Sequence, residues 1–173
     1  IHLITHAEIK RVDGEAGNFK VAITRRARYV NAEKCTGCGI CAQKCPVEAI
    51  DEYDQGLRER GGIFLKYLQA VPLTYLIDRE KCIGCGTCQE VCKAGAVEYD
   101  QKEEDVTLSV GSIIVAPGFE EFDPSLKSEY GYGRYPNVVS SIEFERILSA
   151  SGPYSGMVIR PSDGEVPRRI AFI

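Results

Sequence analysis

No cysteine of this 173-residue chain lies outside two short runs, and several other features are missing as well. No stretch of about 18 apolar residues occurs, which argues against a membrane-spanning helix, and no signal peptide is recognisable. The net charge is −4 and no lysine–arginine block is long, so nothing indicates nucleic-acid binding. No Ser/His/Asp constellation, paired carboxylate site or phosphate-binding loop is found. We therefore expect no catalytic site for bond chemistry in this chain.

The eight cysteines form two copies of the spacing C-x2-C-x2-C-x3-C. The copies run from Cys35 to Cys45 and from Cys82 to Cys92, so that matching cysteines are 47 residues apart. This spacing is typical of loops that bind iron–sulfur clusters, because neighbouring thiolates can point at one centre and iron prefers soft anionic sulfur. Glycines between the cysteines allow the backbone to approach such a cluster closely; they are Gly37, Gly39, Gly84 and Gly86.

The fourth cysteine of each run is expected in the first turn of a helix and turned away from its own loop. In two-cluster proteins this cysteine ligates the cluster of the other run. We therefore assign one [4Fe–4S] cluster to the set Cys35, Cys38, Cys41 and Cys92. The other [4Fe–4S] cluster is assigned to the set Cys82, Cys85, Cys88 and Cys45.

The repeat extends beyond the cysteines, since Tyr29–Asn31 matches Leu76–Asp78 and Ala49–Asp51 matches Ala96–Glu98. Each copy is predicted to form a strand, a cysteine loop, a short helix and a second strand. Two such copies would pack about a pseudo-two-fold axis.

Two other uses of the cysteines fit the spacing less well. Zinc sites usually show paired C-x2-C knuckles separated by a long gap, and disulfides need an oxidising compartment and no such regular spacing. A three-iron cluster is disfavoured because all four ligands of each set are present. Eight thiolates that await metal favour a reducing compartment, and hence the cytoplasm.

The segments around the cysteine runs carry their own patterns. Residues 3–12 and 19–24 are predicted to form a hairpin around the turn at residues 13–18. After the second run, Val106–Val110 reads as a strand and residues 111–118 as a buried, parallel-type strand. Residues 140–148 are predicted to form an amphipathic helix with Ser140 or Ser141 as its N-cap.

Two stretches suggest contacts beyond the chain. Residues 55–75 form a long connection with an apolar run from Ile63 to Leu76, which we expect to pack on another domain or subunit; a partial strand is the alternative. Residues 169–173 read as the beginning of a strand, and the first residue is not Met. The sequence is therefore expected to be an excerpt of a longer protein.

The order of hairpin, two-cluster segment and return to Val106–Gly118 resembles the A subunit of heterodisulfide reductase and its relatives. The segments VGSIIVAPGF (110–119) and EYGYGRYPNVVSSIEFERILSASGP (129–153) also look like this family. The resemblance implies an α+β chain in which a bacterial-type two-cluster ferredoxin module, residues 29–101, is inserted into part of an FAD-binding α/β domain. Residues 1–28 and 102–173 would then belong to that interrupted domain.

The same resemblance implies a function and a set of partners. It implies one-electron transfer through two [4Fe–4S] clusters in a flavin-based, bifurcating redox complex, with other redox subunits and an external ferredoxin as partners. The family's flavin-contacting strand end corresponds to Ala116, Pro117 and Gly118, and the glycine-rich FAD fingerprint would lie upstream of Ile1. In the second run Lys93 follows the fourth cysteine, where the first run has Pro46. This replacement implies a small difference in reduction potential between the two clusters. A structural docking module is the alternative.

Overall fold

The computed structural model describes all 173 residues, and the chain forms two compact units. Unit 1 contains Ile1–Val47, Gly61–Leu65 and Gln69–Gly118, and unit 2 contains Glu48–Arg60, Lys66–Leu68 and Phe119–Ile173. Both cysteine runs lie in unit 1. The long connection between the runs therefore alternates between the units, because its residues 61–65 belong with the cysteine loops.

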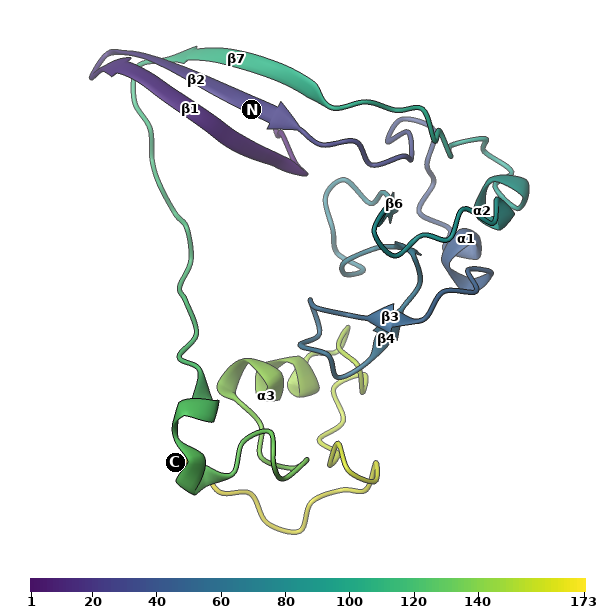
Figure 1. Cartoon of the computed structure of the whole chain (residues 1–173), viewed down its shortest axis with the longest axis vertical. Helices are drawn as coiled ribbons and strands as arrows, with labels where there is room; N and C mark the ends of the chain where they lie inside the picture. The colour runs from purple at the N-terminus through teal and green to yellow at the C-terminus, as the bar shows by residue number, and fades with distance from the viewer. The chain divides into compact units, whose positions relative to one another are not determined.

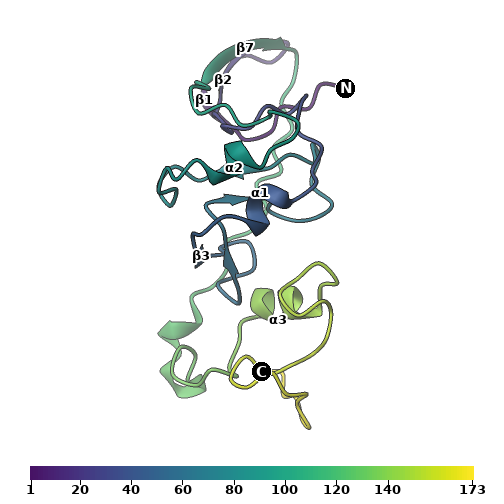
Figure 2. The ribbon, with the colours of Figure 1, turned by 90° about the vertical axis from the view of Figure 1, so that its right-hand side faces the viewer.

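A three-stranded antiparallel sheet is the largest regular element of unit 1. Its strand order is β1 (Ala7–Glu15), β2 (Asn18–Arg25) and β7 (Glu104–Val110), which Figures 1 and 2 show as one long twisted ribbon. The predicted hairpin is confirmed, with its turn shortened to two residues. Residues 19–25 also pair with β7, which joins segments on either side of the cysteine runs.

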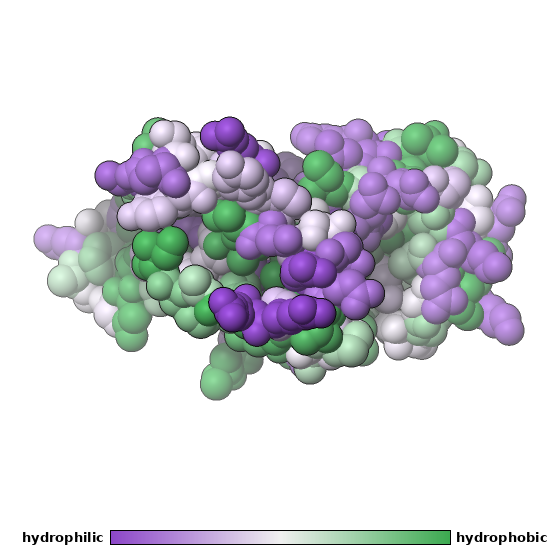
Figure 3. Space-filling view, turned by 90° about the horizontal axis from the view of Figure 1, so that it is seen from below, coloured by the Kyte–Doolittle hydropathy of each residue, from purple (hydrophilic) through white to green (hydrophobic).

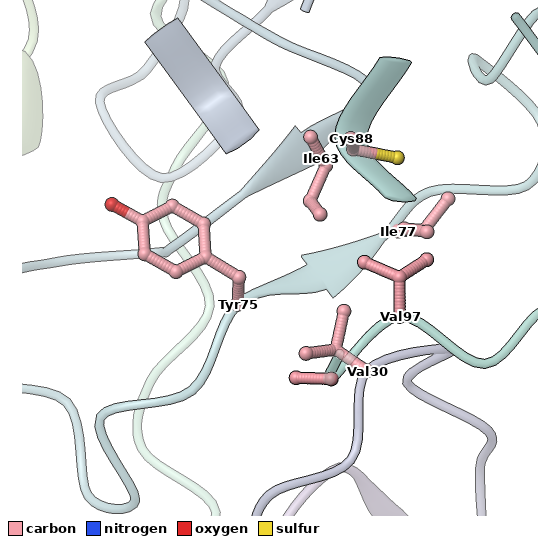
Figure 4. Close-up of a cluster of buried hydrophobic side chains, with 7 residues drawn as sticks. Val30, Ile63, Tyr75, Ile77, Cys88 and Val97 are labelled. Atoms are coloured by element: carbon pink, nitrogen blue, oxygen red, sulfur yellow. The ribbon is translucent and has the colours of Figure 1, made fainter. Parts of the chain in front are cut away.

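The apolar core of unit 1 lies between the two cysteine runs. Val30 bridges to Val97, and β5 (Ile63–Phe64) pairs with β6 (Leu76–Ile77). Figure 4 shows side chains from these segments converging with Cys88, which is itself buried. Val30 at the start of the first copy thus pairs with the end of the second copy. Ile77 at the start of the second copy pairs with the connection between the runs.

The pairing departs from the predicted symmetry at one place. If the copies were fully equivalent, the Val30–Val97 bridge would require Ile77 to pair with Ile50, the counterpart of Val97. Instead Ile77 pairs with Ile63, while β3 (Ala49–Ile50) pairs with β4 (Glu59–Arg60) in unit 2. Ile50 is 64% exposed, whereas Ile63 is 2% exposed. The connection therefore supplies the strand that the first copy was predicted to supply.

Each cysteine run contains a short helix, α1 (Ile40–Gln43) or α2 (Thr87–Glu90), and the two helices lie side by side in both ribbon views. The helices hold the third cysteines, Cys41 and Cys88. The prediction that each fourth cysteine lies in a first helical turn is wrong, because Cys45 and Cys92 follow the helix ends. Each helix begins directly after a glycine, two residues after the second cysteine.

Unit 2 is organised around a buried ion pair. Arg146 of α3 (Ser141–Leu148) donates from Nε to Asp54 Oδ1 at 2.8 Å, and Arg58 lies 2.6 Å from Asp54 Oδ2. The Arg146 guanidinium also lies 4.6 Å from the ring centroid of Tyr53. The predicted N-cap of α3 is confirmed at Ser140, which forms a capping box with Glu143. These contacts fix residues 51–58 to α3 within unit 2.

Three predictions for apolar stretches need correction. Residues 111–118 and 169–173 form no strand and are exposed, because neither stretch has a neighbouring strand to pair with in this chain. In the connection, Ile63 and Phe64 are buried in unit 1 as a partial strand, which was the alternative interpretation. Leu68 and Val71 stay exposed. None of the helices has the length and apolar character needed to cross a membrane.

Replacing Ile63 by alanine should weaken unit 1 far more than the same change at Ile50. The free energy of unfolding should fall by about 2–5 kcal/mol for Ile63→Ala, since a buried side chain is truncated, and by less than about 0.5 kcal/mol for the exposed Ile50→Ala. Denaturant midpoints of the two variants measure the difference. Equal losses would show that Ile50, as the sequence repeat suggested, holds the core.

Candidate metal centre

Four thiols from both cysteine runs line one hollow in unit 1. Cys82, Cys85 and Cys88 come from the second run, and Cys45 comes from the end of the first. Apolar and polar neighbours complete the lining; they include Val47, Ile63, Ile77, Ile83 and Tyr99. The structure thus brings together the four cysteines that the sequence assigned to one ligand set.

The chemistry of this hollow fits a polynuclear cluster, because four thiols from the two runs line it. No group of three or more His, Cys, Asp or Glu side chains is placed closely enough to hold a single metal ion. A zinc site would draw its sulfurs to about 2.3 Å from one ion. The donor set of four thiols around a wider space matches an iron–sulfur cube.

Backbone N–H groups point at the cysteine sulfurs in both runs. Gly62 donates to Cys45 Sγ at 3.2 Å, and Ala96 donates to Cys92 Sγ at 3.3 Å. The backbone N–H of Ile40 and the hydroxyl of Thr87, the matching position of the repeat, lower the pKa values of Cys38 and Cys85 respectively. Such donors stabilise negative charge on the sulfurs, which is the charge that metal ligation requires.

Burial raises the pKa values of the two cysteines that lie in the helices, Cys41 and Cys88, and so opposes the effect of the hydrogen-bond donors. It raises the pKa of Cys41 to about 11, with further contributions from the charges of Cys35, Cys38 and Cys88. Burial also raises the pKa of Cys88, whose Sγ lies 3.1 Å from Tyr99 Oη. These thiols are protonated without metal, so metal binding must release their protons.

The other predicted set combines Cys35, Cys38 and Cys41 with Cys92. The first three act on one another and on Tyr75, whose pKa is raised by burial and then by their charges. Cys92 is connected to this run through the backbone: the Asn31 N–H donates to Ala96 O at 2.7 Å, and the Cys35 N–H donates to Asn31 O at 2.9 Å. These bonds lie next to the Val30–Val97 bridge.

The two cysteine loops differ in how they are covered. Leu73 lies over Gly37, where a Cβ atom would be 2.8 Å from the Leu73 Cδ2 atom, and the Tyr75 hydroxyl lies over Gly39. At Gly84 and Gly86 of the second loop, a Cβ atom would meet nothing within 4 Å. The neighbouring Ile83 is 69% exposed. The first loop is therefore shielded and the second is open.

Sequence reasoning missed several residues that contact the two cysteine runs. Gly61–Gly62, Leu73 and Tyr99 lie outside the cysteine spacing, and their contacts depend on the path of the connection. The only signal was the pair of adjacent glycines just before an apolar run. The predicted flavin-contact residues Ala116, Pro117 and Gly118 are exposed and belong to no helix or strand, so their role stays a prediction.

Gly37 and Gly84 provide a matched test of this difference in cover. Both have positive φ, +69° and +70°, so alanine imposes the same backbone strain at each. Only Gly37→Ala also collides with Leu73, which should add about 1–3 kcal/mol. We expect Gly37→Ala to lose iron to a chelator faster than Gly84→Ala, and Gly37→Ala/Leu73→Ala to recover. Equal rates for the two single variants would contradict the shielding by Leu73.

Comparison with known proteins agrees with this geometry. The 4Fe-4S binding domain family matches residues 28–51 and 75–98, which indicates two [4Fe–4S] clusters. The chain is 51% identical over 173 residues to the iron-sulfur A subunit of the CoB–CoM heterodisulfide reductase of Methanocaldococcus jannaschii. It is 50% identical to the A subunit of the H(2):CoB-CoM heterodisulfide,ferredoxin reductase of Methanothermobacter marburgensis and 41% identical to that of the Ferredoxin:CoB-CoM heterodisulfide reductase of Methanosarcina mazei.

In each case all of this chain is covered, but it spans only 26%, 26% and 22% of the respective relative. The two matched repeats are the two cysteine runs that the fold brings together. Over its whole length the chain is similar to the A subunits of heterodisulfide reductases, and it carries two 4Fe-4S binding repeats.

Proposed function

We propose that this chain transfers single electrons within a heterodisulfide reductase-like complex, using two [4Fe–4S] clusters with crossed ligand sets. Cys35, Cys38, Cys41 and Cys92 hold one cluster, and Cys82, Cys85, Cys88 and Cys45 hold the other. The observation that carries the proposal is the hollow in which Cys45 joins the three cysteines of the second run. The clusters supply the redox chemistry, and the protein contributes binding, orientation and electrostatics.

The arrangement of the two runs supports a short route between the clusters. Helices α1 and α2 pack together, and their cysteines Cys41 and Cys88 lie near enough for their charges to interact. The apolar core around Val30, Ile63 and Val97 excludes water from this region. Backbone N–H groups that point at the sulfurs tune how strongly each site favours an added electron.

The wider setting is part of the same proposal. The ferredoxin-type module, residues 29–101, is inserted into an FAD-binding domain to which residues 1–28 and 102–173 belong, and Ala116–Gly118 adjoin the flavin. Electrons pass between that FAD, these clusters and other redox subunits or a ferredoxin, in a reaction that includes flavin-based bifurcation. The support is the similarity to the A subunits of heterodisulfide reductases over the whole chain.

Exposed apolar side chains outside the cysteine runs are consistent with this setting. Ile114 is 94% exposed, Val115 and Phe119 are each 76% exposed, and Phe172 is 81% exposed. Figure 3 shows apolar side chains distributed among polar ones over the face it presents. Side chains of this kind are usually covered by further protein, as an interrupted FAD-binding domain would require.

Serine substitutions can test the crossed ligand sets. Cys45→Ser and Cys85→Ser should change the same signal in electron paramagnetic resonance spectra of the reduced protein, and Cys92→Ser and Cys38→Ser should change the other. The reason is that serine replaces one of four thiolates at a single cluster. If Cys45→Ser and Cys38→Ser instead affect the same signal, each run closes its own cluster and the crossing is wrong.

A second function remains in competition: the clusters could serve mainly to stabilise a subunit interface. Leu68 and Val71 of the connection are 69% and 70% exposed, as a docking surface would require. Cys38→Ser separates the two functions. Electron transfer should fall at least tenfold while the complex stays assembled, as size-exclusion chromatography and ferredoxin reduction would report. Loss of assembly with little change in the redox rate would favour the docking function.

A further inference from the structure

The segment Gly61–Gly62 lies against Cys45, although it belongs to neither copy of the repeat. The Gly62 N–H donates to Cys45 Sγ at 3.2 Å, and Gly62 is buried. On its other side the Gly62 carbonyl accepts from the Asp78 N–H at 2.8 Å, and Asp78 O accepts from the Cys82 N–H at 2.8 Å. One glycine therefore connects the fourth cysteine of the first run to the first cysteine of the second.

The same arrangement occurs on the other side of the pseudo-symmetry. There the Ala96 N–H donates to Cys92 Sγ at 3.3 Å, and the Ala96 carbonyl accepts from the Asn31 N–H at 2.7 Å. Gly62 thus does for Cys45 what Ala96 does for Cys92. The sequence repeat pairs Ala96 with Ala49, but Ala49 lies in β3 of unit 2 and pairs with Arg60.

Gly61 is required by the closeness of its contact with Cys45. A Cβ atom on Gly61 would lie 3.0 Å from Cys45 Cβ and 3.3 Å from its Sγ, and the backbone O of Ile63 would lie 3.1 Å away. A Cβ atom on Gly62 would come no nearer than 3.4 Å to Cys82 Cα, an ordinary contact. Gly61 is therefore the position at which a side chain would displace the Cys45 thiolate.

We propose that Gly61–Gly62 is a positioning element of the second cluster, which orients Cys45 and sets the potential of that cluster through the Gly62 N–H. This inference rests on the proposed function, because it assumes that Cys45 ligates a cluster. A hydrogen bond to a ligating sulfur stabilises the more negative, reduced state and so raises the reduction potential. The two clusters then differ in one respect. In the first, Cys92 receives this donor from its own copy of the repeat, whereas in the second, Cys45 receives it from the connection.

The test compares Gly61→Ala with Gly111→Ala and Gly62→Ala in the complete protein. None of the three glycines has a positive φ, and a Cβ atom on Gly111 would meet nothing nearer than 4.0 Å. Gly61→Ala should shift one of the two reduction potentials to a more negative value, and iron loss to a chelator should be about 10–100-fold faster, the usual range for outer-shell changes. Gly111→Ala should match the wild type, and Gly62→Ala, which keeps its N–H, should shift the potential less than Gly61→Ala does.

Ligand variants identify the affected cluster. The effect of Gly61→Ala should persist in a Cys38→Ser background and vanish in a Cys85→Ser background. The inference is overturned if Gly61→Ala matches Gly111→Ala, or if it shifts the cluster that Cys85→Ser leaves intact. Iron and sulfide contents below two clusters per wild-type chain would instead overturn the proposed function.

A measurement on the wild-type protein covers the case in which Gly61→Ala does not fold. With ¹⁵N-labelled glycine, the reduced second cluster should show hyperfine coupling to a glycine amide nitrogen, and this coupling should weaken in Gly62→Ala, where the nitrogen at that position is unlabelled. Unchanged coupling in Gly62→Ala would contradict the contact between Gly62 and Cys45.

Discussion

The structure depends on bringing the fourth thiol of one cysteine run to the three thiols of the other. In two-cluster ferredoxins the fourth cysteine of a run ligates the cluster of the other run, and here Cys45 lines one hollow with Cys82, Cys85 and Cys88. The antiparallel Val30–Val97 bridge and the β5–β6 pair meet this constraint, because they hold the two runs on either side of one apolar core. With the runs held in this way, α1 packs against α2 and Cys88 is buried. Cys45 then lines the same hollow as the cysteines of the second run.

The two loops that result are chemically similar but differently enclosed. Leu73 and Tyr75 cover the first loop, and the second presents Gly84 and Ile83 to its surroundings. Exposure is one of the quantities that set the potential of an iron–sulfur cluster. The difference in potential that the sequence predicts from Lys93 would therefore have a second, structural source in the residues of the connection that cover the first loop.

Much of the site could be predicted from the sequence, because ligand spacing is a local property. The spacing within each cysteine run, the hairpin and the Ser140 cap depend on residues close together in the chain, and the hairpin and the cap agree with the structure. The role of Ile63 could not be read in the same way. Ile50 matches the repeat, and only the competition between two apolar segments for one edge of β6 decides which is buried. Residues 111–118 were misread because a parallel strand needs neighbours that a single sequence segment does not name.

The position of Gly62 is set by the path of the connection. Residues 48–60 and 66–68, on either side of Gly61–Leu65 along the chain, belong to unit 2, where Arg146 binds Asp54. The stretch that carries the amide facing Cys45 is therefore bounded in sequence on both sides by residues of unit 2, so its length is limited by segments that have packing partners of their own.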